Sequence, residues 1–363
     1  MPELHIGNLT AKIPIIQGGM GVGISLSGLA SAVADEGGIG VIASVGIDVL
    51  GTEKRGREIA VKGFRRQILR AKAKTDGIIG VNIMMALSDF DDHLNAALEA
   101  GADIIFMGAG LPLKIPQLLT PDRMQEESVR IIPIVSSARA ADLICKTWMK
   151  SGCIPDAFVV EGPMAGGHLG FKKEQLNDPD YSLENLTCET ISMVQSFEQR
   201  FGKAIPVIAA GGVYSGKDIH RFIQMGASGV QMATRFVATH ECDADIRFKQ
   251  TFLQAKKTDL MIIDSPVGLP GRAIRDTYLD DVSAGGKKPF ICPWKCLRTC
   301  NFKEAPYCIA QALIQAKYGN LDDGFAFAGA NVWRVNEITS VKDLIQSLIR
   351  EYEFAAEPEL VMA

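Results

Sequence analysis

The stretch Ala157–Gly170, with the sequence AFVVEGPMAGGHLG, is an apolar run that ends in a glycine-rich loop around one histidine. Consecutive apolar residues before such a loop are typical of a buried parallel strand. A second stretch, Ile205–Val213 (IPVIAAGGV), has the same design. Glycine adopts positive φ and lets a bound molecule approach the backbone. Both stretches therefore predict strands of a parallel sheet whose following loops hold a ligand.

Apolar runs of this kind recur eight times before residue 237, and amphipathic segments separate them. The predicted strands are Pro14–Gln17, Ile39–Ala43, Ile78–Ile83, Asp103–Met107, Ile131–Val135, Ala157–Val160, Pro206–Ala209 and Gly229–Met232. The predicted helices include Ser25–Glu36, Asp89–Ala100, Ala138–Lys150, Leu183–Phe201 and Ser215–Met225. Strict alternation predicts a parallel sheet, and eight units favour a closed (β/α)8 barrel over an open doubly wound sheet. Glycine-rich loops after several different strands also favour the barrel, because a barrel gathers all these loops at one mouth.

The alternation of strands and helices stops after residue 239. We expect a barrel over residues 1–239, and an insertion over 240–335 that caps its mouth and carries a cysteine cluster at 292–308. Residues 336–363 complete the chain, and the amphipathic segment Val341–Glu351 predicts a last helix that packs on the barrel.

Composition excludes several function classes. The 38 Lys and Arg residues against 42 Asp and Glu give a net charge of −4 with no long basic block, which argues against a nucleic-acid partner. No apolar run approaches the roughly 18 residues of a membrane span, and the N-terminus does not resemble a signal peptide. We expect a cytoplasmic α/β protein that acts on a small molecule. Its oligomeric state stays open, with a homodimer as one alternative.

His168 is the candidate catalytic residue. It lies between glycines at the expected barrel mouth, so few neighbouring side chains are available to bury it as a structural histidine. Imidazole accepts and donates protons near neutral pH.

The barrel prediction also places a phosphate site and a ring site at the mouth. Backbone N–H groups of Gly211 and Gly212, together with Ala233 and Thr234 after the eighth strand, match the usual phosphate position of such barrels. The loop that contains Gly18, Gly19 and Met20 could pack against a flat ring, and Asn82 could hydrogen-bond to a ring edge. This loop is not a dinucleotide fingerprint, because no acidic residue follows a second strand at the required position.

Taken together, these motifs resemble the nitronate monooxygenase (2-nitropropane dioxygenase) family of FMN-dependent barrels, a group that includes enoyl-acyl carrier protein reductase II. The resemblance covers roughly residues 8–275 and is carried by Pro14–Gly23, Val81–Met84, Glu161–Gly170, Ala209–Gly212 and Gly229–Phe236. It implies FMN as cofactor and His168 as the catalytic base. The implied cofactor-binding residues are Gly18, Gly19, Met20, Asn82, Glu161, Gly166, Gly167, Gly211, Gly212, Gln231, Ala233 and Thr234. The family often has glycine at the position of Ala233, and the resemblance fades after about residue 280.

The resemblance implies oxidation of alkyl nitronates or nitroalkanes to carbonyl compounds and nitrite with O2. The main alternative is an NAD(P)H-dependent enoyl-thioester reductase or a related NAD(P)H:flavin reductase of the same fold, which would use NAD(P)H as co-substrate. An alternative of another class is a non-catalytic flavin-binding barrel, which would not depend on His168.

Four cysteines cluster in the C-terminal region: Cys292, Cys296, Cys300 and Cys308. Their spacing matches neither the common zinc patterns nor the ferredoxin runs. We therefore favour packing of a small cap over metal ligation and predict no metal site. An iron–sulfur cluster or zinc is the alternative, since grouped cysteines in a cytoplasmic chain favour metal over disulfides. A cluster that fed electrons to FMN would make an oxygen-using reaction less favoured.

Overall fold

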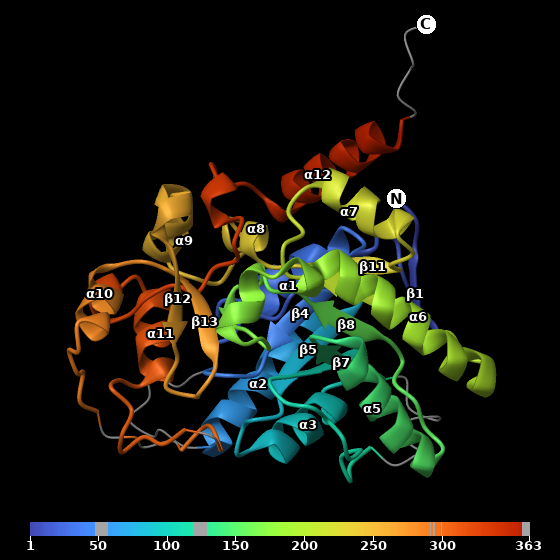
Figure 1. Cartoon of the computed structure of the whole chain (residues 1–363), viewed down its shortest axis with the longest axis horizontal. Helices are drawn as coiled ribbons and strands as arrows, with labels where there is room; N and C mark the ends of the chain where they lie inside the picture. The colour runs from blue at the N-terminus through green and yellow to red at the C-terminus, as the bar shows by residue number, and fades with distance from the viewer. Residues whose placement is uncertain (48–56, 120–128, 291, 293–294, 299, 358–363) are drawn as a thin grey trace, which may run out of the picture.

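The computed structural model describes residues 1–47, 57–119, 129–290, 292, 295–298 and 300–357. Its centre is a parallel sheet in the order β3-β11-β10-β8-β7-β6-β5-β4, surrounded by helices (Figure 1). The strands are β3 (Ile15–Gln17), β4 (Gly40–Ala43), β5 (Ile79–Met84), β6 (Ile104–Gly108), β7 (Arg130–Val135), β8 (Phe158–Glu161), β10 (Val207–Ala210) and β11 (Gly229–Met232). The two strands at the ends of this order, β3 and β4, also meet. A parallel bridge joins Ile16 of β3 to Ile39, the residue before β4, and the Gln17 N–H donates to the Ile39 carbonyl at 2.9 Å. The predicted (β/α)8 barrel is therefore confirmed.

All eight predicted strands form, each within two residues of its expected bounds. The outer layer contains α1 (Ser27–Asp35), α2 (Arg57–Lys72), α3 (Phe90–Glu99), α5 (Ala138–Trp148), α6 (Leu183–Phe201), α7 (Gly216–Gln224) and the short α8 (Thr234–Val237). The connection between β6 and β7 includes residues 120–128, which lie outside the described residues. None of the described helices has the length and apolar character needed to cross a membrane.

Local sequence signals fix several helix ends. The Ser215 hydroxyl accepts from the Asp218 N–H while the Asp218 carboxylate accepts from the Ser215 N–H, which forms a capping box at the start of α7. The helix α6 ends where Gly202 adopts a left-handed conformation, as expected for a glycine C-cap. Short 3-10 helices occupy Met149–Ser151, Lys173–Asn177, Pro179–Tyr181, Lys257–Asp259, Leu321–Asp323 and Val332–Arg334.

Alternate residues of each barrel strand belong to two different apolar cores. Inward-facing residues such as Val41, Phe106 and Val159 form the barrel interior. Outward-facing neighbours such as Ile42 and Phe158 pack against the helices. Because successive side chains of a strand point to opposite faces, every barrel strand is apolar on both sides.

An antiparallel hairpin closes the N-terminal end of the barrel interior. It consists of β1 (Leu4–Ile6) and β2 (Leu9–Ala11). Leu4 and Ile6 are fully buried in the same core as the inward-facing barrel residues. A ligand therefore reaches the barrel from the opposite end, where the C-terminal ends of the strands lie.

The chain after residue 240 adds a second sheet that includes part of the histidine loop. The strands β12 (Leu260–Asp264), β13 (Pro270–Ile274) and the two-residue β9 (Gly167–His168) form an antiparallel sheet in that order. Helices α9 (Ile246–Gln254), α10 (Thr277–Ser283) and α11 (Ile309–Lys317) belong to this part of the chain (Figure 1). The last helix, α12 (Val341–Ala356), packs against α7 and extends five residues beyond the predicted Glu351.

Candidate active site

Three polar side chains lie at the top of the otherwise apolar barrel interior. In the sheet, Glu161 of β8 and Gln231 of β11 are the register partners of Ala210, which belongs to the interior core. Asn82 of β5 is the register partner of Phe106, another interior residue. Laterally paired residues of a parallel sheet point to the same face, so all three polar side chains point into the barrel. They form a polar layer at the mouth.

Glu161 is the ionisable member of this layer. Burial raises the pKa of its carboxyl group to about 7. A carboxyl group without a close cation favours its neutral form when water is removed. Near neutral pH this residue can therefore act as a hydrogen-bond donor as well as an acceptor.

His168 belongs to the second sheet rather than to a free loop. Its β9 backbone pairs with Gly271 of β13. Its Nε2 lies 2.7 Å from the Oγ of Ser265, a buried residue in the turn between β12 and β13. The edge of the Phe327 ring lies against the imidazole, with ring centroids 5.1 Å apart. The ring orientation is therefore fixed from two sides.

Burial of His168 lowers the pKa of its imidazole to about 4. The side chain is consequently neutral at physiological pH and can accept a proton on a ring nitrogen. This is the protonation state that a general base requires.

The glycine loop predicted to contact a ring lies against the polar layer. A Cβ added at Gly19 would lie 2.5 Å from the Cβ of Asn82, and one added at Gly18 would lie 3.3 Å from the Gln231 side chain. Only glycine allows the backbone of this loop to approach Asn82 so closely. The neighbouring Met20 is half-buried, and its N–H donates to the Ser25 hydroxyl at 2.8 Å.

The predicted phosphate loop has a conformation that requires glycine. Gly211 and Gly212 have φ values of +82° and +125°. A Cβ at Gly211 would lie 2.7 Å from the Gly162 carbonyl oxygen, so this loop and the histidine loop are in direct contact. Thr234 begins α8, and Ala233 is its N-cap residue. The loop and the short helix are the two candidate phosphate-binding elements.

A segment near residue 330 crosses these elements, and the sequence analysis did not find it. The Asn331 Nδ2 donates to the Gly212 carbonyl at 2.7 Å. The Gly329 N–H donates to the Thr234 Oγ1 at 3.2 Å, and the Ala330 N–H donates to the Met164 carbonyl at 3.0 Å. A Cβ at Gly166 would collide with the backbone of the same segment. Residues 328–331 therefore complete the wall beside the predicted phosphate site.

A buried arginine holds the histidine loop in place. Arg272 of β13 is 8% exposed, and its guanidinium donates to the carbonyl oxygens of Pro163 and Ala165, both at 2.6 Å. Burial lowers the pKa of this guanidinium. Within the described residues, no carboxylate forms an ion pair with Arg272. In the described part of the chain, this positive charge is therefore balanced by backbone carbonyl groups alone.

The sequence analysis also missed Ser265, Arg272 and Phe327. They lie between 97 and 159 positions beyond His168 along the chain, and no local pattern connects them to it. The one available signal was the segment Ser265–Ile274, whose glycine and proline residues indicate a turn. The sequence predicts a cap over the mouth without indicating which of its residues face inward.

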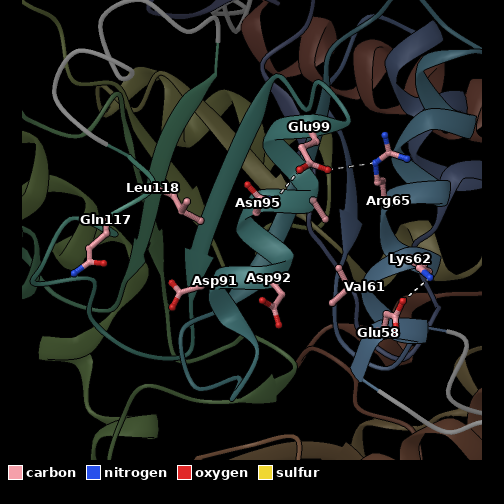
Figure 2. Close-up of a pocket in the computed structure, with 11 residues that line it drawn as sticks. Glu58, Val61, Lys62, Arg65, Asp91, Asp92, Asn95, Glu99, Gln117 and Leu118 are labelled. Carbon is pink, nitrogen blue, oxygen red and sulfur yellow. Dashed lines mark hydrogen bonds and ion pairs between the residues drawn. The ribbon is translucent and has the colours of Figure 1, made fainter.

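A groove of about 1020 Å³ lies elsewhere in the described part of the chain. It runs between α2 and α3 on the outside of the barrel (Figure 2). Its walls carry ion pairs such as Lys62–Glu58 at 2.5 Å and Arg65–Glu99 at 3.7 Å. None of the predicted site residues lines this groove, and its exposed charges are typical of a solvated surface between helices.

The barrel with its polar mouth and neutral histidine is typical of a TIM-barrel enzyme, and the family match makes it a flavin-dependent oxidoreductase. The chain belongs to the nitronate monooxygenase family, whose profile matches residues 3–351. This match extends well beyond the resemblance found in the sequence, which ended near residue 275.

Some individual relatives are named as nitronate monooxygenases, and others are named as different enzymes. A carboxyl-CoA dehydrogenase of Mycobacterium tuberculosis, (3aS,4S,5R,7aS)-5-hydroxy-7a-methyl-1-oxo-octahydro-1H-indene-4-carboxyl-CoA dehydrogenase, is 28% identical over 76% of this chain and 66% of its own length. A probable nitronate monooxygenase of Staphylococcus saprophyticus is 25% identical over 75% of this chain and 78% of its own length. The structure of FabK from Thermotoga maritima aligns with a TM-score of 0.73 and 26% identity, covering 96% of this chain and 94% of that one.

Proposed function

We propose that this protein is an FMN-dependent nitronate monooxygenase that oxidises alkyl nitronates or nitroalkanes to carbonyl compounds and nitrite with O2. Membership of the family supports the reaction class. The observation that carries the proposal is His168, a half-buried, neutral base whose ring is held against Ser265 in the loop that follows β8.

The residues at the mouth fit an FMN cofactor. The loop around Gly18 and Gly19 offers an open backbone surface for the ring, and Asn82 and Gln231 offer hydrogen bonds at its edge. The Gly211–Gly212 loop offers a concave backbone that a side chain would fill, which suits a phosphate group. When bound, FMN would supply the redox chemistry.

His168 would act on the substrate carbon. A neutral imidazole accepts the α-proton of a nitroalkane, which leaves the nitronate anion. Ser265 can orient the ring through its 2.7 Å contact with Nε2. Arg272, with no carboxylate partner among the described residues, would favour a negative charge near the histidine loop.

One set of observations favours the second candidate, an NAD(P)H-dependent enoyl-thioester reductase. The similarity to FabK, an enoyl-acyl carrier protein reductase II, and to a carboxyl-CoA dehydrogenase supports a thioester substrate. The same neutral His168 could then position the substrate for protonation. The two candidates differ in the reductant, because only the reductase requires NAD(P)H.

Anaerobic stopped-flow mixing distinguishes the two functions. The purified protein is mixed separately with a nitronate and with NAD(P)H while flavin absorbance is followed. The proposal predicts bleaching by the nitronate and none by NAD(P)H, together with nitrite release in air. Fast bleaching by NAD(P)H alone would contradict it and favour the reductase. Equal behaviour of the wild type and His168→Ala in both assays would favour a non-catalytic flavin-binding barrel.

A further inference from the structure

A crossing segment, residues 328–334, lies against the histidine loop, the predicted phosphate loop and the start of α8. Its side chains Ala328 and Val332 are buried in the main apolar core. Two of its N–H groups donate to the Met164 carbonyl at 3.0 Å and to the Thr234 Oγ1 at 3.2 Å. The position of the crossing segment is therefore fixed both by packing and by hydrogen bonds.

Asn331 of the crossing segment uses its side chain in an unusual way. It occupies the N-cap position of the 3-10 helix Val332–Arg334, but its side chain makes no cap hydrogen bond. Asparagine at the start of a helix usually accepts a hydrogen bond from a backbone N–H of the first turn. Here the side-chain amide instead donates to the Gly212 carbonyl at 2.7 Å, across 119 positions of the chain. The side chain thus serves the predicted phosphate loop rather than its own helix.

The contact fixes a peptide group that glycine leaves free to rotate. Gly211 and Gly212 both have positive φ, and glycine adopts positive and negative φ about equally well. In the described residues, no group other than the Asn331 amide donates to the Gly212 carbonyl. The peptide between Gly212 and Val213 is trans, so its N–H points away from Asn331. One hydrogen bond therefore sets the direction of both the carbonyl and the N–H.

This loop presents N–H groups that the protein itself does not use. Among the residues that the structure describes, no protein group accepts a hydrogen bond from the N–H of Gly212 or of Val213. The next two N–H groups, of Tyr214 and Ser215, both donate to the Asp218 carboxylate, at 3.1 and 2.9 Å. Val213 is only 9% exposed, and a buried N–H without a protein partner is uncommon. Successive free N–H groups of this kind form anion-binding concavities.

We propose that Asn331 is a positioning residue for the phosphate group of FMN, an inference that rests on the proposed cofactor. By holding the Gly212 carbonyl toward the crossing segment, Asn331 leaves the Val213 N–H available to the phosphate. If this peptide rotated, the carbonyl oxygen would replace the N–H, and its partial negative charge would repel the phosphate. The residue that selects the anion-binding form of the loop thus comes from the chain after the barrel.

The test compares FMN with riboflavin, which lacks the phosphate group. The dissociation constants of both flavins are measured on the full-length protein from the fluorescence of released flavin. Asn331→Ala should weaken FMN binding about 3–10-fold, as expected for one lost hydrogen bond. Its affinity for riboflavin should stay close to that of the wild type. The control is Asn336→Ala, at an exposed position five residues further on, which should bind both flavins like the wild type.

A second variant keeps the shape of the side chain. Asn331→Asp replaces the N–H donor by a carboxylate, so it should weaken FMN binding more than Asn331→Ala does and again affect riboflavin little. This variant decides if Asn331→Ala does not fold. The phosphorus NMR resonance of bound FMN should shift in both Asn331 variants and stay unchanged in Asn336→Ala, which gives a reading that does not require riboflavin to bind.

Two results would overturn the proposal. Equal weakening of FMN and riboflavin would show that Asn331 supports the fold of the mouth rather than the phosphate. Unchanged FMN affinity with an unchanged phosphorus resonance would show that the loop does not depend on Asn331. No nitronate or NAD(P)H enters these measurements, so the proposed reaction can fail while the inference stands. Wild-type protein that binds no FMN would overturn the proposed function and the inference together, whereas the other outcomes concern Asn331 alone.

Discussion

The Oγ of Ser265 lies 2.7 Å from the Nε2 of His168, although 97 positions separate the two residues in the chain. The contact joins the loop after β8 to the turn between β12 and β13. Because Phe327 limits rotation from the other side, Ser265 is the polar group that selects one orientation of the imidazole. The barrel supplies the loop, but the second sheet fixes the base.

This relationship predicts the effect of Ser265→Ala. Loss of one hydrogen bond of about 0.5–1.5 kcal/mol should lower kcat roughly 3–10-fold by allowing the ring to move, while flavin content stays normal. Steady-state kinetics and flavin quantitation measure both quantities. Ser265→Thr keeps the hydroxyl and should retain more activity than Ser265→Ala. Equal loss in the two variants would show that steric fit, rather than the hydrogen bond, positions His168.

Replacement of the base itself should be more severe. His168→Ala should reduce turnover by about 10²–10⁴, the usual contribution of a general base, with flavin still bound. In the wild type, burial holds the His168 pKa near 4, so the base stays neutral and its contribution to the rate should persist well below pH 6. A profile of kcat against pH measures how far this contribution extends on the acid side. An acid limb near the ordinary value of 6.5 that disappears in His168→Gln would contradict the assignment of a buried, neutral base.

The glycine loop after β10 provides a test of the cofactor site. Gly212→Asp should strongly reduce flavin occupancy, because a carboxylate would be placed beside the predicted phosphate position. Absorbance of the purified variant measures the occupancy. The matched control is Gly202→Asp, which also introduces a side chain at positive φ but faces open space at the end of α6. Full flavin occupancy in Gly212→Asp would place the phosphate elsewhere.

The raised pKa of Glu161 predicts that the free energy of unfolding depends on pH. Its folded-state pKa of about 7 lies above the ordinary value of 4.5, so the fold favours the protonated form. Between these two values the unfolded chain binds fewer protons than the folded chain. The contribution of Glu161 to the free energy of unfolding therefore decreases as pH rises through this window.

Glu161→Gln should remove that decrease. Relative to the wild type, the variant should gain about 1–3 kcal/mol between pH 4.5 and pH 8. Denaturant unfolding at several pH values measures the gain. Glu174→Gln, at an exposed position, serves as the control and should follow the wild type. A parallel pH dependence in the wild type and Glu161→Gln would show that this carboxyl group does not have a raised pKa.

Strand positions could be predicted because each barrel strand carries its own signal. Every strand is apolar on both faces, so runs such as Ile205–Ala210 stand out without knowledge of the fold. The hairpin β1–β2 was missed because its strands have three residues each. The dipeptide Gly7-Asn8 between Ile6 and Leu9 was its available signal, since two such residues between apolar ones favour a tight turn.

The candidate site could be predicted only where its residues lie near the end of a barrel strand or in the loop that follows it. Asn82 could be predicted because a polar residue near the end of an apolar strand lies at the mouth of a barrel, whereas Gln231 was implied only by the family resemblance. Arg272 and Asn331 act through long-range contacts with backbone carbonyl groups, and no spacing in the sequence encodes them. The roles of the predicted residues stay predictions that the variants above would test.

The pairing of β9 with β13 has a consequence for the order in which the protein matures. During synthesis the eight barrel strands emerge from the ribosome by residue 232, whereas the strand that pairs with His168 ends only at Ile274 and Asn331 follows later still. A nascent barrel therefore lacks an oriented base and the wall beside its predicted phosphate loop. Competence for catalysis would arise only after the last third of the chain has been translated.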